Sequence, residues 1–214
     1  MQEYGAVVMA VSGFSEYIGS QFGNPRGLVG KCCCVVMNVI NKAMYLKVVS
    51  LVKLNDKSKV LDIGYGNGYL IKKLYKKYRP FIFGIDISED MRAATEKRNA
   101  AASKDGRLSL IIGDCCELRY EDGAFDAVTS VNTVYFWNDT LKGMKEIFRV
   151  LKPGGRFYNA VYAKEWFRNL SYTRKGYKLF EREDYISLCE QVGFSKMEFI
   201  DISKGKSFVM VYTK

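Results

Sequence analysis

Three glycines and two aspartates are the residues whose types and spacing first suggest chemistry. Residues 60–70 read VLDIGYGNGYL, so that Asp62 precedes glycines at positions 64, 66 and 68. Glycine at these positions lets the chain turn sharply and lets a ligand lie against the main chain, which a Cβ atom would prevent. Asp86 follows 18 residues after Gly68, and a carboxylate there could accept hydrogen bonds from both hydroxyls of a ribose. The pattern predicts a loop that binds an adenosine-containing ligand.

Further candidates lie near the second and third predicted strands. Asp114 could reach an adenine amino group, and Ile87 and Met91 could supply the apolar faces around the ring. Asp86 taken alone could equally be a helix-capping acid. A dinucleotide fingerprint of the type G-x-G-x-x-G would need glycine at the position of Tyr69, which weakens the nicotinamide interpretation without excluding it.

An alternation of strands and helices must position these residues. Apolar strands are predicted at 59–63, 81–86, 108–112, 125–131 and 156–161, with helices at 67–78, 88–102 and 141–151. This order is typical of a doubly wound α/β sheet with right-handed crossovers. Ligands bind beyond the carboxyl ends of such strands, where Asp62, Asp86, Asp114 and the segment 130–133 are all expected to lie.

The two ends of the chain depart from this alternation. Residues 184–191 are predicted to be helical, and 195–202 and 207–212 are predicted to form a hairpin that adds an antiparallel strand to the sheet. Residues 1–57 are predicted to form an N-terminal helical cap, and 58–214 the main domain, within one compact unit. The cap could lid the glycine-rich loop or simply cover the sheet.

Composition and charge narrow the class of protein. Hydrophobic residues at 48% and charged residues at 26% are those of an ordinary globular protein. Because no apolar run is long enough to span a bilayer and the start lacks a basic n-region, we expect a cytoplasmic protein. The net charge of +10 suggests acidic partners. However, Lys72, Lys73, Lys76 and Lys77 form one stripe of a predicted helix, as on a solvated face, so nucleic acid is a less favoured partner.

The chain contains no histidine, which removes the commonest metal ligand and the commonest general base. Its six cysteines include the run Cys32, Cys33 and Cys34, which is not a disulfide framework in a chain of this size. Consecutive residues on a helix point about 100° apart, so these thiols cannot converge on one ion. Packing in a reducing compartment is favoured over a metal or metalloid role, and we expect no metal ion.

Five segments together carry a family resemblance. VLDIGYGNGYL, GIDISEDM, GDCCEL, FDAVTSVNTVYFW and RVLKPGGRF, in this order and spacing, resemble the motifs of class I S-adenosylmethionine-dependent methyltransferases, particularly the small-molecule, UbiE-like type. The resemblance covers about residues 58–162. It implies a seven-stranded, mostly parallel, Rossmann-like sheet with an antiparallel C-terminal strand, and S-adenosylmethionine as the cofactor.

The resemblance also implies a role for each motif residue. The methionine part of the cofactor would be held by Asp62, Gly64 and Gly66, and Tyr65 and Gly68 in the same loop are also expected to bind the cofactor. Asp86 would hold the ribose, and Asp114 with the backbone of Cys115 the adenine. Asn132 and Thr133 would border the sulfonium and the substrate.

Methyl transfer is an in-line displacement, in which the enzyme mainly places the nucleophile about 3 Å from the methyl group. A base is needed only if the acceptor carries a proton of high pKa. Without histidine, Tyr135 is the first candidate for that base, with Tyr17, Glu165 or a carboxylate that the sequence does not identify as alternatives. Tyr135 could instead be a core or cofactor-packing aromatic residue.

The acceptor is harder to infer. After the fourth strand the chain reads SVNT, whereas enzymes that methylate base amino groups usually carry Asn or Asp followed by Pro-Pro and an aromatic residue. No Pro-Cys pair is present for attack on cytosine carbon. Aromatic residues between basic ones in 163–184 could stack a planar or anionic substrate, or pack beneath a loop; they are Trp166, Phe167, Tyr172, Tyr177 and Phe180. We expect a small-molecule acceptor, with RNA or protein methylation and a non-catalytic cofactor-binding module as alternatives, in a monomer or homodimer.

Overall fold

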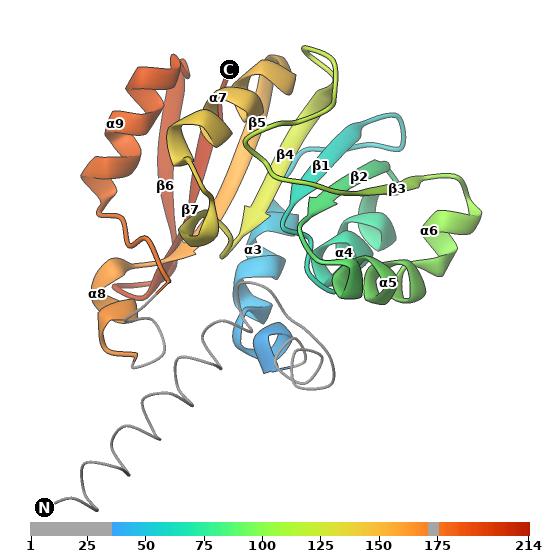
Figure 1. The fold of residues 1–214 in the computed structure, drawn as a ribbon, viewed down its shortest axis with the longest axis horizontal. Coiled ribbons are helices and arrows are strands. Elements are labelled where there is room, and N and C mark those ends of the chain that lie inside the picture. The colour runs from blue at the N-terminus through green and yellow to red at the C-terminus, as the bar shows by residue number, and fades with distance from the viewer. Residues whose placement is uncertain (1–35, 171–175) are drawn as a thin grey trace, which may run out of the picture.

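A computed structural model of the chain describes residues 36–170 and 176–214. Most of the predicted cap, with Tyr17 and the run Cys32–34, lies outside the described residues, as does Tyr172. Seven strands form one sheet in the order β3-β2-β1-β4-β5-β7-β6, flanked by helices (Figure 1). The predicted Rossmann-like architecture is therefore confirmed.

Apart from β5, which begins at Leu151 rather than at Arg156, the strands begin and end close to the predicted bounds. They are β1 Lys59–Ile63, β2 Phe81–Asp86, β3 Leu108–Ile112, β4 Phe125–Val131, β5 Leu151–Tyr162, β6 Lys196–Ser203 and β7 Ser207–Thr213. Strands β1 to β5 pair in parallel, whereas β7 runs antiparallel to both of its neighbours, β5 and β6. The C-terminal hairpin thus supplies the one antiparallel strand that the sequence predicts.

The helices in the described residues follow the same alternation. They are α3 Lys42–Leu51, α4 Tyr69–Tyr78, α5 Glu89–Arg98, α6 Ala100–Lys104, η1 Val134–Phe136, α7 Thr140–Val150, α8 Lys164–Arg168 and α9 Arg182–Val192. No helix in this part of the chain has the length and apolarity needed to cross a membrane.

Three local differences from the predicted elements have physical causes. The predicted helix 88–102 breaks at Asn99, whose side-chain amide donates to the carbonyl oxygens of Gly68, at 3.1 Å, and Thr95, at 3.0 Å. The LKPGG segment belongs to β5 through a register shift against β4, rather than forming a separate turn. Part of the segment 163–184, expected to be a loop, forms helix α8.

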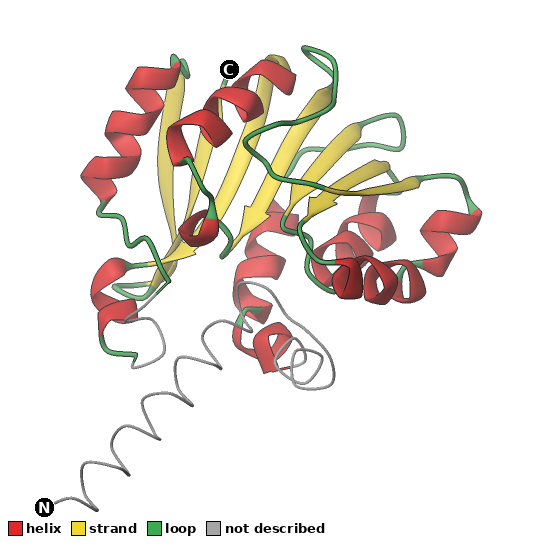
Figure 2. Ribbon diagram, viewed as in Figure 1, coloured by secondary structure: helices red, strands yellow, loops and turns green. Residues whose placement is uncertain are grey.

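Helices cover both faces of the sheet (Figure 2). Neighbouring residues on a strand point to opposite faces, and the ring of Phe157 stacks on Trp137 and Tyr212, on the face where α7 and α9 pack together. Helices α3, α4 and α5 form a second group of neighbours. Because both faces are covered, the central strands β1 and β4 are buried almost throughout.

Helix α3 connects the cap to the sheet. It packs against α4 and against strands β4, β5, β6 and β7, with Met44, Val48 and Val49 buried. The preceding residues 36–40 are also helical, and Asn41 forms a turn between the two helical segments. This arrangement places the described part of the cap beside the carboxyl end of β4.

Candidate functional site

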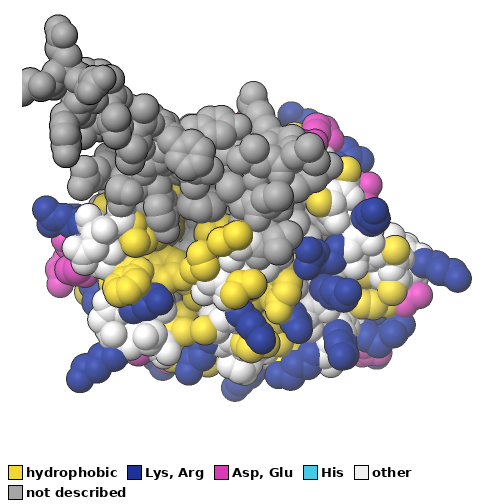
Figure 3. All heavy atoms as spheres, turned by 90° about the horizontal axis from the view of Figure 1, so that it is seen from below, with side chains coloured by type: hydrophobic (Ala, Val, Ile, Leu, Met, Phe, Trp, Pro, Cys, Tyr) yellow, Lys and Arg dark blue, Asp and Glu magenta, His cyan; other side chains and the backbone are white. Residues whose placement is uncertain are grey.

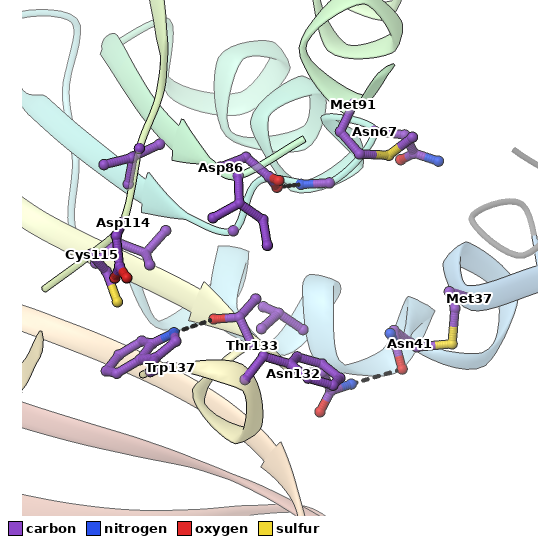
Figure 4. Close-up of a pocket in the computed structure, with 18 of the residues that line it drawn as sticks. Met37, Asn41, Asn67, Asp86, Met91, Asp114, Cys115, Asn132, Thr133 and Trp137 are labelled. Carbon is purple, nitrogen blue, oxygen red and sulfur yellow. Dashed lines mark hydrogen bonds between the residues drawn. The ribbon is translucent and has the colours of Figure 1, made fainter. Parts of the chain in front are cut away.

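A pocket lies at the carboxyl ends of the central strands, as the fold predicts (Figure 4). Loops after β1, β2, β3 and β4 contribute to it, and the helical segment before α3 and α3 itself close its other side. Its lining residues include Met37, Asn38, Asn41, Tyr45, Gly64, Gly66, Asn67, Asp86, Ile87, Met91, Asp114, Cys115, Val131, Asn132, Thr133, Phe136, Trp137 and Asn138.

The glycine-rich loop after β1 is held in a conformation that favours glycine. Gly64, Gly66 and Gly68 have φ angles of 66°, 51° and 72°, in the left-handed region that L side chains rarely adopt. A Cβ atom on Gly64 would lie 2.3 Å from Cγ2 of Thr133, and one on Gly68 would lie 2.5 Å from Nδ2 of Asn99. A Cβ atom on Gly66 would meet nothing within 4 Å. Two of the glycines therefore permit close packing, whereas Gly66 leaves open space in the pocket.

Asp86 joins the end of β2 to this loop. Its carboxylate accepts hydrogen bonds from the backbone N–H of Gly66 at 2.8 Å and of Ser88 at 3.0 Å. Burial raises the pKa of Asp86, although these hydrogen bonds oppose the shift. Each carboxylate oxygen retains a further acceptor site, so the side chain can still accept hydrogen bonds from two ligand hydroxyls.

Asp114 lies at the opposite end of the pocket from Met37 and Asn41 (Figure 4). Its carboxylate accepts hydrogen bonds from the backbone N–H of Cys116 at 2.8 Å and from the side-chain amide of Asn138 at 2.6 Å. Burial raises the pKa of Asp114, but these donors together with the thiols of Cys116 and Cys115 bring it below its ordinary value. An ionised acceptor therefore faces the place where an adenine amino group is expected.

A buried polar network supports the loop after β4. Asn132 has a φ angle of 58°, unusual for a residue other than glycine. Its amide nitrogen donates to Oδ1 of Asn41 at 2.9 Å, and the hydroxyl of Tyr162 donates to the same oxygen at 3.0 Å. The hydroxyl of Tyr135 donates to Oδ1 of Asn132 at 3.3 Å and accepts from the backbone N–H of Tyr162 at 2.7 Å. The network fixes Asn132 between the cap and the sheet.

Lys178, from the segment before α9, holds the part of the loop after β4 that contains Trp137 and Asn138. Its ammonium group donates to the carbonyl oxygens of Trp137 at 2.8 Å and Asn138 at 2.7 Å. Its backbone N–H donates to the carbonyl oxygen of Tyr135 at 3.0 Å. On the other side, the indole nitrogen of Trp137 donates to Oγ1 of Thr133 at 3.1 Å. This part of the pocket is therefore rigidly positioned by hydrogen bonds.

Nine of the predicted site residues line the pocket: Gly64, Gly66, Asp86, Ile87, Met91, Asp114, Cys115, Asn132 and Thr133. Four do not. Asp62 and Tyr65 are buried, at 2% and 4% exposed, and Gly68 packs against Asn99 and Thr95 beneath the loop. Tyr135 is only 2% exposed, and burial raises its pKa well above the ordinary value. The position of Tyr135 is that of a supporting residue rather than of a base in contact with a substrate.

Asp62 occupies an unusual environment. Its carboxyl group accepts a hydrogen bond from the hydroxyl of Thr129 at 2.7 Å. Burial raises the pKa of Asp62 to about 7, because it disfavours the ionised form more than this hydrogen bond favours it. The neighbouring carboxylate of Asp86 also contributes to raising the pKa of Asp62.

Several lining residues were not singled out by their sequence pattern. Met37, Asn38, Asn41 and Tyr45 come from the cap region, and Phe136, Trp137 and Asn138 follow Tyr135. The sequence feature that could have identified the first group is the presence of two polar residues, Asn38 and Asn41, inside an apolar helical segment. For the second group it was an aromatic run directly after a buried strand.

The comparisons with known proteins agree with this geometry. Residues 61–159 match the family described as a methyltransferase domain. The chain is 36% identical over 98 residues to the uncharacterised methyltransferase YdaC of Bacillus subtilis, covering 45% of this chain and 52% of that protein. It is 31% identical over 110 residues to the ubiquinone/menaquinone biosynthesis C-methyltransferase UbiE of Geotalea daltonii, covering 50% and 47%. The chain therefore spans about half the length of these curated relatives.

Solved structures share the fold. A chain of the Haloferax volcanii complex between the Trm112 methyltransferase activator and a methyltransferase superposes with a TM-score of 0.72 at 21% identity, covering 84% of this chain and 92% of that one. Haemonchus contortus phosphoethanolamine N-methyltransferase 2, in complex with S-adenosyl-L-methionine, superposes with a TM-score of 0.67 at 20% identity, covering 81% and 52%. The matched domain and the pocket at the strand ends show that residues 61–159 form a methyltransferase domain, of the kind whose cofactor is S-adenosylmethionine.

Proposed function

We propose that the protein transfers the methyl group of S-adenosylmethionine to a small-molecule acceptor. The observation that carries this proposal is a single pocket whose two ends differ in chemistry. Asp114 lies at one end and Met37 with Asn41 at the other (Figure 4), Asp86 and Gly66 supply an acceptor and open space, and Tyr45 and Phe136 add aromatic lining. Small-molecule sites are typically concave and mostly apolar, with a few polar groups that fix orientation.

The residues present fit the cofactor. Asp86 offers two carboxylate oxygens to a ribose, Asp114 offers an ionised acceptor to an adenine amino group, and Gly66 lets the ligand lie against the main chain. Ile87 and Met91 line the stretch between the two acids. The cofactor supplies an electrophilic methyl group on a cationic sulfur, so the protein has only to bind, orient and exclude water.

The acceptor end offers few groups that titrate. Among the lining residues that the structure describes, the titratable side chains are Asp86, Asp114, Cys115 and Tyr45, and the first three lie toward the proposed ribose and adenine positions. We therefore do not retain Tyr135 as a base. We propose instead an acceptor atom that presents a lone pair or a readily formed anion, oriented by Asn38, Asn41 and Asn132.

The cap and the loop after β4 would orient that acceptor. Asn41 accepts hydrogen bonds from Asn132 and Tyr162, which ties the cap to the loop on which Thr133 and Trp137 lie. Prepositioned groups cost no reorganisation when the acceptor arrives. This arrangement supports displacement by positioning rather than by proton abstraction.

Calorimetry with S-adenosylhomocysteine and with NAD is the first test. We expect S-adenosylhomocysteine to bind and NAD not to bind. Binding of NAD alone would refute the cofactor assignment. Asp86→Asn serves as the matched variant, because it removes carboxylate acceptor capacity while keeping the shape of the side chain.

The second test identifies the acceptor class. Methyl-labelled S-adenosylmethionine is incubated with the protein and separate small-molecule, RNA and protein fractions of a cell extract, and label is expected in the small-molecule fraction. RNA is the second candidate, because the chain carries a net charge of +10. Lys72, Lys76 and Lys77 are exposed on α4, and many Lys and Arg side chains occupy the face shown in Figure 3. Label in RNA, with binding that weakens steeply as salt rises, would replace the small-molecule proposal. Cofactor binding without transfer to any fraction would indicate a non-catalytic module.

A further inference from the structure

Three neighbouring side chains at one end of the pocket form a group of potential metal ligands. The carboxylate of Asp114 and the sulfur atoms of Cys115 and Cys116 all lie within 4.8 Å of one another. Asp114 and Cys115 line the pocket, whereas Cys116 lies just behind it, with its thiol donating to the carbonyl oxygen of Asp139 at 3.1 Å. Both cysteines are buried and neither is in a disulfide. The group therefore combines two free thiols with a carboxylate that the pocket makes accessible.

The donor set selects a class of ion. Sulfur donors suit zinc and softer ions, whereas magnesium and calcium take oxygen ligands. A tetrahedral zinc site, with Zn–S bonds of about 2.3 Å and Zn–O bonds of about 2.0–2.2 Å, places its donors about 3.4–3.8 Å apart. The observed spacing of up to 4.8 Å therefore has to contract by at most about 1.4 Å.

The surroundings supply further features of such a site. The carbonyl oxygen of Asp139, already next to the sulfur of Cys116, or a water molecule from the pocket is available as a fourth donor. The side-chain amide of Asn138 donates to the carboxylate of Asp114 at 2.6 Å. Hydrogen bonds of this kind orient a metal ligand from outside the coordination sphere.

We propose that Asp114, Cys115 and Cys116 bind a thiophilic divalent cation such as Zn²⁺. Binding replaces each S–H bond with a sulfur–metal bond, so two protons are released for each ion bound. No oxidant or reductant is required. The sequence analysis drew attention to the run Cys32–34 rather than to these residues. Here the turn after β3 places the thiols of two consecutive cysteines close to the carboxylate of Asp114.

The position of the cation has a consequence for the cofactor. Because Asp114 is the proposed adenine contact, a cation held there excludes the adenine ring, and cofactor and cation bind competitively. This consequence rests on the proposed function, whereas the cation site itself does not.

The test titrates the reduced full-length chain with Cd²⁺ in the presence of a phosphine reductant, and follows the ultraviolet thiolate-to-cadmium charge-transfer band. Each titration is made with the native chain and with a chain in which Cys32, Cys33 and Cys34 are replaced by serine, so that this run cannot supply the band. We expect a band that saturates with one equivalent in the second chain. Its absence would overturn the site.

Single substitutions in the second chain assign the ligands. Cys115→Ser and Cys116→Ser should each weaken Cd²⁺ binding by at least tenfold, because loss of a ligand costs more than the 10- to 100-fold range known for supporting contacts. Cys189→Ser is the matched control, since Cys189 is a buried free cysteine on α9, and it should titrate like its parent. Unchanged titrations of Cys115→Ser and Cys116→Ser, or an equal loss in Cys189→Ser, would overturn the assignment.

Competition is measured by calorimetry with S-adenosylhomocysteine in the presence and absence of Cd²⁺. We expect Cd²⁺ to raise the apparent dissociation constant of the parent chain for S-adenosylhomocysteine. In Cys116→Ser, Cd²⁺ should leave this constant nearly unchanged, because one metal ligand is missing. The variant should still bind S-adenosylhomocysteine, because residue 116 keeps its backbone contact to Asp114 and does not line the pocket. Independent binding of the two ligands would overturn the competition. Cd²⁺ binding without any binding of S-adenosylhomocysteine would refute the proposed function and leave the cation site standing.

Discussion

The substitution Asp62→Asn tests how burial shapes the region beneath the glycine-rich loop. The carboxyl group of Asp62 has its pKa raised from 3.8 to about 7 by burial. In the unfolded chain it ionises near its ordinary pKa, whereas the folded protein keeps the proton until the pH approaches 7. Because the folded pKa is the higher one, the stability associated with this group is fully present below about pH 4 and is lost as the pH rises to about 7.

The magnitude follows from the two pKa values. The difference between 7 and 3.8, at about 1.4 kcal/mol per pH unit, corresponds to about 4 kcal/mol of unfolding free energy. Asparagine does not titrate, and its side-chain oxygen can still accept the hydrogen bond from Thr129. The free energy of unfolding of Asp62→Asn minus that of the native protein should therefore rise by about 4 kcal/mol between about pH 4 and about pH 8.

Urea unfolding followed by circular dichroism across this pH range measures the difference directly. Asp126→Asn on β4 is the control. Burial raises the pKa of Asp126, but hydrogen bonds from Lys152 and from the backbone N–H of Lys59 bring it below the ordinary value. Because the folded pKa of Asp126 lies below the ordinary one, its carboxylate is ionised in both states above about pH 5, so the stability difference between Asp126→Asn and the native protein should stay nearly constant from about pH 5 to about pH 8 and change only as the pH falls through about 4. A difference for Asp62→Asn that stays constant with pH would refute the reasoning.

Three further predictions concern the pocket. Gly64→Ala should lower the free energy of unfolding by about 1–3 kcal/mol, because its Cβ atom would collide with Thr133. Gly66→Ala should lower the free energy of unfolding by at most about 1–2 kcal/mol but should weaken S-adenosylhomocysteine binding in calorimetry. A larger loss of stability in Gly66→Ala, or a larger loss of binding in Gly64→Ala, would contradict the loop geometry. Asp86→Asn should cost about 1–3 kcal/mol of that affinity, and unchanged affinity would place the ribose elsewhere. Asn41→Leu leaves the amide of Asn132 and the hydroxyl of Tyr162 without their acceptor. It should therefore lower the free energy of unfolding in urea by about 2–4 kcal/mol. An Asn41→Asp variant keeps the acceptor, and equal losses of stability in both variants would argue against the hydrogen bonds as the cause.

The architecture was predictable because its signals are local. Most strands are apolar runs, the connections from β1 to β2, from β2 to β3 and from β4 to β5 each contain a helix, and the residues that follow the strands are read directly from the chain. Since the carboxyl ends of parallel strands share one edge of the sheet, Gly64, Asp86, Asp114 and Asn132 had to meet there. The antiparallel hairpin at the C-terminus was predictable from a different local signal, the short turn between the strand segments 195–202 and 207–212.

Which of these residues face the pocket depended on the tertiary structure. Asp62 belongs to the recognised motif, yet alternation along β1 points its side chain away from Ile63 and against Thr129, 67 positions away. Tyr135 follows β4 as predicted, but its hydroxyl is held between Asn132 and the backbone of Tyr162. Sequence spacing specifies where a strand ends and does not specify which side chain the neighbouring strands will bury.

The contribution of the cap was likewise decided only by long-range packing. Asn41 meets Asn132 across 91 positions and Tyr162 across 121, and no periodic pattern encodes pairs at such distances. The sequence by itself determined the doubly wound α/β fold class, the glycine-rich turn and the acids at the strand ends, because short segments specify these features. The tertiary structure alone decided which polar groups are buried, which pKa values shift and which cap residues complete the pocket, because these depend on contacts between segments that are far apart in the chain.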